Sequence, residues 1–167
     1  MNSKFRCLIG SAVVFALISS TPGVAQTQAE PLVEGIFHDY TAALDASGPW
    51  QIVGPWSATV NPTSGSVEFD ATLSMVRSDS VPRQSHAHRI QMTDGVPTPI
   101  ANGFQITGTA VITNNGNLAP FSGSPITLEI TGGTAVNFIN FTVTFGGGAA
   151  AHFGTEPIDG VVTRSVI

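Results

Sequence analysis

From Gly48 onward, polar and apolar residues alternate along most of the chain, which is the two-residue period of strands with one buried face. The clearest run is 66–77, in which every second residue is apolar: Val67, Phe69, Ala71, Leu73 and Met75. Similar runs cover 51–60, 85–93, 104–113, 125–131, 135–145 and 160–167. Turn-forming residues separate them, for example at 61–65, 94–99 and 114–116. The pattern therefore predicts about seven or eight strands.

Short connections between these runs favour antiparallel pairing, because parallel pairs need long crossovers. Two architectures fit such a chain: a single antiparallel β-barrel and a two-sheet β-sandwich. We favour the barrel, since long amphipathic strands would leave costly exposed edges in an open sheet. No internal repeat or linker divides 49–167, so we expect one all-β barrel domain there.

The segment before the alternating region has a different period. Across 32–46, apolar residues recur every four positions: Leu32, Ile36, Tyr40 and Leu44. Together with Pro31 at the start, this spacing predicts one short N-terminal helix. We therefore interpret 26–48 as a polar leader followed by that helix. Gly35 weakens the interpretation, and an irregular segment is the alternative.

Residues 1–25 have the three parts of a secretory signal peptide. Lys4 and Arg6 give a basic start, an apolar run covers 8–18, and small residues lead to Ala25. The apolar run is shorter than the ~20 residues that span a bilayer. We therefore expect cleavage after Ala25 and a secreted protein, extracellular or periplasmic. An uncleaved membrane anchor is the alternative.

Removal of the signal peptide changes the composition of the chain. The single cysteine, Cys7, is lost, so disulfides cannot stabilise the mature protein. Four arginines and eleven acidic residues remain, which gives a net charge of −7 with neutral histidines. An acidic surface repels phosphate backbones and anionic lipids, so we expect neither nucleic acid nor a membrane surface as partner. The partners that remain are a small molecule or a carbohydrate.

The strand expected at 85–93 carries a His-X-His pair on its apolar face. His86 and His88 lie on the same face of the strand as Ile90 and Met92, whereas Arg89 lies on the opposite, polar face. Residues two apart in a strand are about 6.6 Å apart, so two imidazoles can converge on one ion. The alternative is a pair of buried histidines that bond backbone carbonyls. We interpret the pair as an internal metal or ligand site.

A catalytic metal usually needs a third protein ligand. His152 is the best candidate, because it lies in a Gly/Ala-rich segment where little side-chain bulk obstructs approach. His38 is a second candidate, but the helix interpretation places it on the polar face and in solvent. Glu156 is a candidate carboxylate ligand or catalytic general base, and a plain loop acid is the alternative.

The donor atoms restrict the metal. With no thiolate in the mature chain, an imidazole-rich site favours zinc, copper, iron or nickel. These observations predict a secreted β-barrel with an internal histidine-based metal or ligand site, and a metal-dependent enzyme acting on a small molecule is one hypothesis for it. Whether the protein is an enzyme stays open at this point.

A non-catalytic binding module is the competing hypothesis. Trp50 and Trp56 flank a Gly-Pro break, and exposed tryptophans can stack on sugar rings or bind apolar small molecules. Buried, the same residues anchor the core, which we consider the better interpretation. Arg77 ends its strand in register with the inner face, where it can bind an anion or reach into water.

Overall fold

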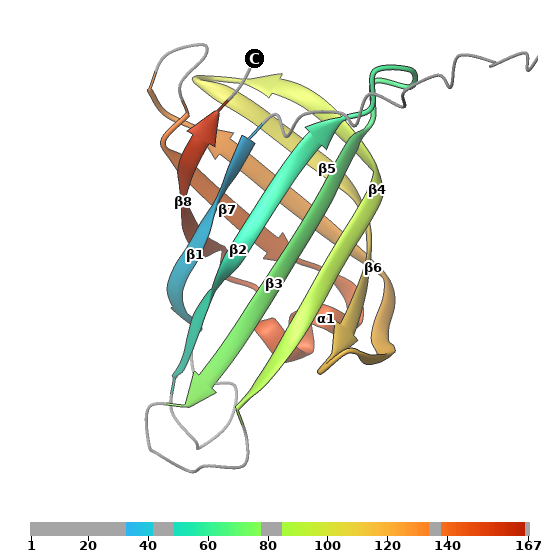
Figure 1. Cartoon of the computed structure of the whole chain (residues 1–167), viewed down its shortest axis with the longest axis vertical. Helices are drawn as coiled ribbons and strands as arrows, with labels where there is room; N and C mark the ends of the chain where they lie inside the picture. Colours follow the sequence, from blue (N-terminus) through green and yellow to red (C-terminus); the bar gives the residue numbers. More distant parts are fainter. Residues whose placement is uncertain (1–32, 42–48, 78–84, 134–137, 166–167) are drawn as a thin grey trace, which may run out of the picture.

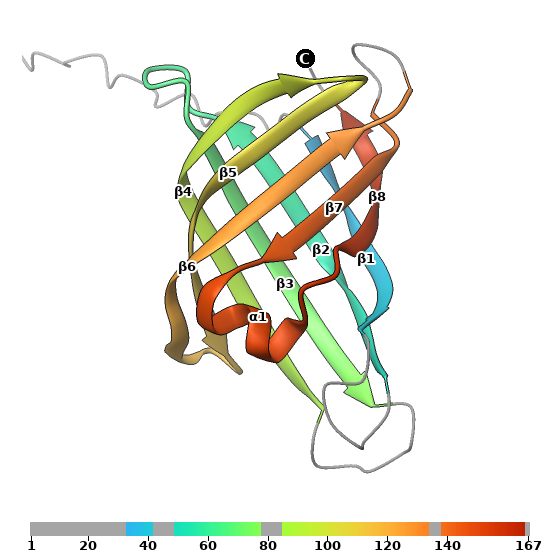
Figure 2. The same ribbon diagram turned by 180° about the vertical axis from the view of Figure 1, so that it is seen from behind.

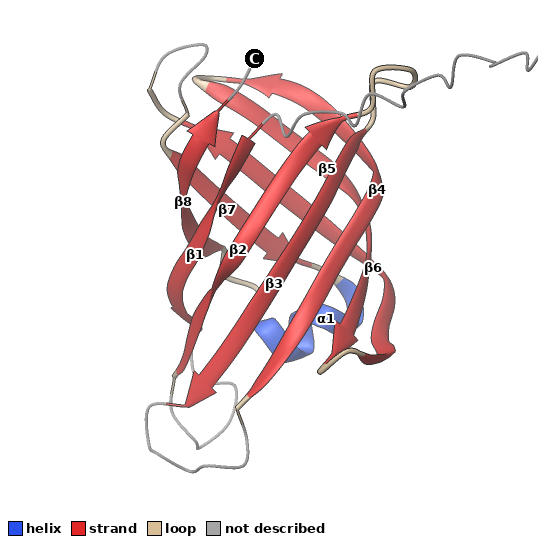
Figure 3. Ribbon diagram, in the orientation of Figure 1, coloured by secondary structure: helices blue, strands red, loops and turns tan. Residues whose placement is uncertain are grey.

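Eight antiparallel strands close into a barrel in the part of the chain that the structure, a computed structural model, describes: residues 33–41, 49–77, 85–133 and 138–165 (Figure 1). The strands are β1 Val33–Thr41, β2 Trp50–Val60, β3 Val67–Arg77, β4 His86–Ile100, β5 Gly103–Asn114, β6 Asn117–Thr131, β7 Asn140–Phe145 and β8 Ile158–Ser165. One short helix, α1 Gly147–Phe153, lies between β7 and β8 (Figure 3). The predicted all-β fold is confirmed.

The strand order decides between barrel and sandwich. Each strand pairs with its neighbours in sequence, and β8 pairs with β1 from Val33↔Ser165 to Phe37↔Gly160. Closure pairs β1 with β8, which removes the exposed edges that these two strands would have in an open sheet. The barrel is therefore confirmed, and the sandwich alternative is wrong.

Alternation of side chains fills the interior, as the sequence predicted. In β3 all five inward residues are at least 98% buried: Val67, Phe69, Ala71, Leu73 and Met75. Trp56 of β2 stacks on Phe141 of β7 with ring centroids 3.9 Å apart, and Phe37 meets Phe141 edge-on at 5.4 Å. These rings pack against one another inside the barrel.

The predicted N-terminal helix is wrong over the residues that can be compared. Residues 33–41 form β1, so the barrel begins inside the segment interpreted as leader and helix, while 42–48 lie outside the described residues. Phe37 is fully buried, whereas Ile36 and Tyr40 are 45% and 55% exposed. A four-residue spacing is also a multiple of two, so Ile36 and Tyr40 share one face of a strand as well as of a helix.

Gly35 has a packing role in β1. A Cβ at this position would clash with the carbonyl oxygen of Val161 and lie 2.6 Å from a ring carbon of Trp56. The residue that weakened the helix prediction is thus the one that lets β1 approach β8 and the indole closely.

The lower end of the barrel holds the helix that the sequence pattern did not predict (Figure 2). Ala149 and Phe153 are four residues apart, share one face of α1 and are buried. Two strands are longer than predicted: β4 continues through the expected turn at 94–99, and β6 begins before Pro125. Among the described residues, no helix is long and apolar enough to cross a membrane. The predicted signal peptide lies outside them.

Candidate metal centre

The histidine pair lies at the start of β4, on the inner face of the barrel. His88 is 1% exposed and His86 is half-buried, and both share their face with the buried Ile90 and Met92. The cross-strand partners in β3 are Met75 for His86 and Leu73 for His88. The predicted inward orientation is therefore confirmed.

Helix α1 brings the third predicted ligand to this pair. His152 Nε2 lies 3.0 Å from His88 Nε2 and 3.2 Å from His86 Nε2. One potential ligand atom from each of the three histidines lies within 4.8 Å of the others, and they form a candidate metal-binding group among the described residues. The buried Phe153 anchors the end of α1, so the neighbouring His152 faces the pair.

The two nitrogen–nitrogen distances to His152 suit a metal ion. Nitrogens bound about 2.05 Å from one ion, at angles of about 90° to 110°, lie about 2.9 to 3.4 Å apart. Both nitrogen–nitrogen distances to His152 Nε2 fall within that range. An ion held by three imidazoles on one side keeps a coordination position for water or a ligand.

A backbone contact holds His88 in the tautomer that a metal needs. His88 Nδ1 lies 2.8 Å from the carbonyl oxygen of Thr113. A carbonyl oxygen only accepts, so Nδ1 carries the proton and donates, which leaves the lone pair on Nε2 facing His152. Metal-binding histidines usually donate their second ring nitrogen in this way.

Burial favours the neutral form of His88 and His152. It lowers the pKa of His88 to about 4, an effect that the Thr113 contact partly opposes and the nearby His152 and His86 reinforce. Burial also lowers the pKa of His152, with a further contribution from His86. Since only a neutral imidazole can bind a metal, both lowered pKa values favour binding at neutral pH.

The turn between β5 and β6 fixes the strand segment that carries the pair. The N–H of Ala87, the residue between the two histidines, donates to Asn115 Oδ1 at 2.9 Å, and the Asn115 N–H donates to the Ala87 carbonyl oxygen at 2.7 Å. Asn115 has a positive φ of 48°, which asparagine tolerates better than most residues. Sequence reasoning recognised this segment only as a turn.

Aromatic rings surround the three imidazoles. Trp50 meets His86 edge-on at 5.3 Å, and Phe121 stacks on His152 at 5.5 Å. Phe153 contacts His88 at 5.0 Å from the interior side. Sequence reasoning missed Phe121 and Phe153, because neither belongs to a local motif that marks a site.

The other predicted site residues lie apart from the cluster. His38 is exposed on the outer face of β1, in solvent as predicted, although on a strand. Glu156 is exposed in the connection between α1 and β8, where it lines a small cavity with Asp39 and Thr41, and it is not one of the clustered ligands. The guanidinium carbon of Arg77 lies 5.5 Å over the Trp50 ring.

The tryptophan pair is not a surface platform. Trp56 is 2% exposed and packed in the core, and Trp50 is half-buried beside His86. The preferred interpretation of Trp56 as a core anchor is confirmed.

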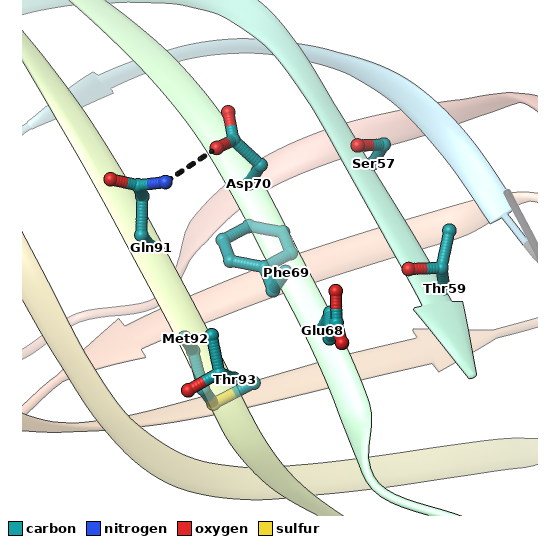
Figure 4. A pocket seen from close by; sticks show the side chains of 8 residues that line it. All are labelled: Ser57, Thr59, Glu68, Phe69, Asp70, Gln91, Met92 and Thr93. Atoms are coloured by element: carbon teal, nitrogen blue, oxygen red, sulfur yellow. Dashed lines mark hydrogen bonds between the residues drawn. The ribbon is translucent and has the colours of Figure 1, made fainter. Parts of the chain in front are cut away.

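A shallow pocket also lies on the outer wall, over β2, β3 and β4 (Figure 4). Its Asp70 is engaged by Arg89 at 2.7 Å and by Gln91 at 3.1 Å. Asp70 points outward from β3, and these contacts tie neighbouring strands together.

Comparison of the chain with known protein families, with curated proteins and with solved structures found no match. The geometry of the histidine cluster is therefore the basis on which a function can be inferred.

Proposed function

We propose that His86, His88 and His152 bind one divalent transition-metal ion, and that this ion is the functional centre of the protein. The observation that carries the proposal is the convergence of one ligand atom from each histidine within 4.8 Å. The Nδ1–H contact of His88 with Thr113 supports it, because it leaves the lone pair of His88 Nε2 directed toward His152 and available to an ion.

The donor set indicates which metals the site takes. Three neutral imidazoles, with no cysteine after residue 25, favour zinc, copper, iron or nickel over the hard cations that prefer oxygen. We propose that the ion keeps one position for a small-molecule substrate and activates it or a bound water as a Lewis acid. The protein would then be a metal-dependent enzyme that acts on a small molecule.

Metal uptake tests the proposal directly. The protein is treated with a chelator, dialysed and titrated with Zn²⁺, and the bound metal is measured by elemental analysis. We expect one equivalent to bind and to raise the melting temperature, because a ligand that binds only the folded state stabilises it. His86→Gln and His152→Gln should each weaken binding by at least about tenfold.

His38→Gln is the matched control. It also removes one imidazole, but from the outer face of β1, so it should bind zinc as the unmodified protein does. Binding of less than about a tenth of an equivalent of zinc, copper, iron and nickel would overturn the proposal. Equal loss of binding in the His38 variant would do so as well, since it would indicate uptake by surface histidines.

We also propose that the protein is exported and released after cleavage following Ala25. The basic start, the apolar run at 8–18 and the small residues before Ala25 support this. N-terminal sequencing of the protein recovered from the expressing culture should begin at Gln26. A chain that retains residues 1–25 in the membrane fraction would contradict the proposal.

A further inference from the structure

Four rings form a continuous row at the end of the barrel that holds the histidines. Trp50 contacts His86, His86 contacts His152, and His152 contacts Phe121, with ring centroids between 5.3 and 5.5 Å apart at each step. All four side chains are half-buried.

Beneath the row lies a fully buried pair, His88 and Phe153, which are 1% and 2% exposed. Solvent therefore reaches the nitrogen cluster from the side of His86 and His152, and not through the core. Trp50 and Phe121 flank this accessible side, and both pack against the core, which restricts their movement. Among the described residues, a ligand that approaches the ion from this side passes close to these two aromatic side chains.

The charge at the site favours an anionic donor. A divalent ion bound by three neutral imidazoles keeps its charge of 2+, because the candidate ligand group contains no carboxylate. In a partly buried position an uncompensated divalent charge is costly, so an anion that replaces water at the ion is strongly favoured.

We propose that the remaining coordination position takes the carboxylate of a small aromatic acid, with its ring lying against Trp50 and Phe121. This inference rests on the proposed metal site and adds the class of ligand to it. The carboxylate halves the charge at the ion while the ring covers two half-exposed aromatic side chains, so each part of the ligand matches one part of the site. Aromatic pairs contribute beyond the area they bury, which gives a ring an advantage over an alkyl group.

The test compares benzoate with acetate on the cobalt-loaded protein. Co²⁺ replaces zinc in imidazole sites, and its visible absorption changes when a ligand enters the coordination sphere. The two acids offer carboxylates of similar basicity and differ in the ring. We expect both to change the cobalt spectrum and benzoate to bind at least about tenfold more tightly. Metal-free protein should bind neither, as measured by calorimetry.

Two substitutions test whether the ring of benzoate lies against Trp50 and Phe121. Trp50→Leu and Phe121→Leu keep apolar bulk and remove the aromatic face, so each should lower benzoate affinity by about two- to tenfold while acetate affinity stays within about twofold. Phe104→Leu is the control, because Phe104 is a partly exposed aromatic residue that pairs with Pro99 near the end of β4, whereas the histidine pair lies at the start of that strand. It should leave both affinities unchanged.

The outcomes separate this inference from the metal proposal. Failure to bind Co²⁺ or Zn²⁺ would overturn both. Metal binding with equal affinity for benzoate and acetate would overturn only the aromatic-acid inference. Binding of benzoate without a change in the cobalt spectrum would also overturn only the aromatic-acid inference. So would Trp50 and Phe121 variants that keep the benzoate preference of the unmodified protein.

Discussion

His88 Nε2 lies 3.0 Å from His152 Nε2, although the two residues are 64 positions apart in the chain. The contact exists because β4 begins and α1 ends at the same end of the barrel (Figure 2). The other ring nitrogen of His88, Nδ1, contacts the Thr113 carbonyl oxygen, so the orientation of the imidazole is already fixed before any ion binds. Such preorganisation lowers the cost of metal binding, since ligands on rigid elements need little ordering.

The lowered pKa of His88 predicts acid sensitivity of the metal-free protein. The unfolded chain takes up a proton at this residue below its ordinary value of 6.5, but the folded protein does so only near pH 4. The free energy of unfolding should therefore be at its full value above pH 6.5 and fall by roughly 3 kcal/mol as the pH decreases to about 4. Urea denaturation across this range, with chelator present, measures the change.

Two variants test whether His88 causes that acid sensitivity. His88→Gln keeps an amide N–H that can donate toward Thr113 but does not titrate, so its stability should depend much less on pH. His38→Gln removes an exposed histidine and should retain the full dependence. Identical stability of the unmodified protein at pH 4 and pH 7 would contradict the burial of an uncharged His88.

Asn115 should influence metal affinity without touching the metal. Asn115→Gly removes the side-chain acceptor of the Ala87 N–H while keeping a residue that tolerates a positive φ. We expect a loss of about 1 kcal/mol in stability and an approximately tenfold loss of zinc affinity, because β4 is then less firmly held between the two histidines. Asn115→Asp keeps the oxygen acceptor and should restore most of the affinity. An equal loss in both variants would show that the hydrogen bond is not the cause.

Gly35 should not tolerate a side chain. Gly35→Ala places a methyl group against the Val161 carbonyl and the Trp56 ring, so the β1–β8 closure must open, at a cost of about 1 to 3 kcal/mol. Gly148→Ala is the control: its new Cβ lies 3.8 Å from Phe121 in ordinary contact, and alanine suits a helix better than glycine. Thermal unfolding of both variants checks the prediction, and an unchanged Gly35→Ala melting temperature would refute it.

Glu156 should be dispensable for metal binding. Its side chain is exposed and is not among the clustered ligands, so Glu156→Gln should bind zinc within about twofold of the unmodified protein. The zinc titration used for the histidine variants measures this. A tenfold loss would return Glu156 to the ligand set that the sequence first raised.

Local patterns accounted for the strands and the inward pair, because the two-residue period places alternate side chains on one face wherever a strand forms. They misjudged β1, where Ile36 and Tyr40 fit both a strand and a helix. The turn expected at 94–99 was also wrong: β4 crosses it, with a register shift between Gln91 and Val96, and Pro97 and Pro99 are accommodated within the strand.

The sequence by itself determined that His86 and His88 share the apolar face of a strand, and that residues 26–167 offer them no thiolate partner. Only the tertiary structure decided that His152, and not His38 or Glu156, completes the group. That choice depends on barrel closure and on the anchoring of α1 by Ala149 and Phe153, which are long-range contacts. Local periodicity reports the direction of a side chain from its own strand, but it carries no information about which distant element lies opposite.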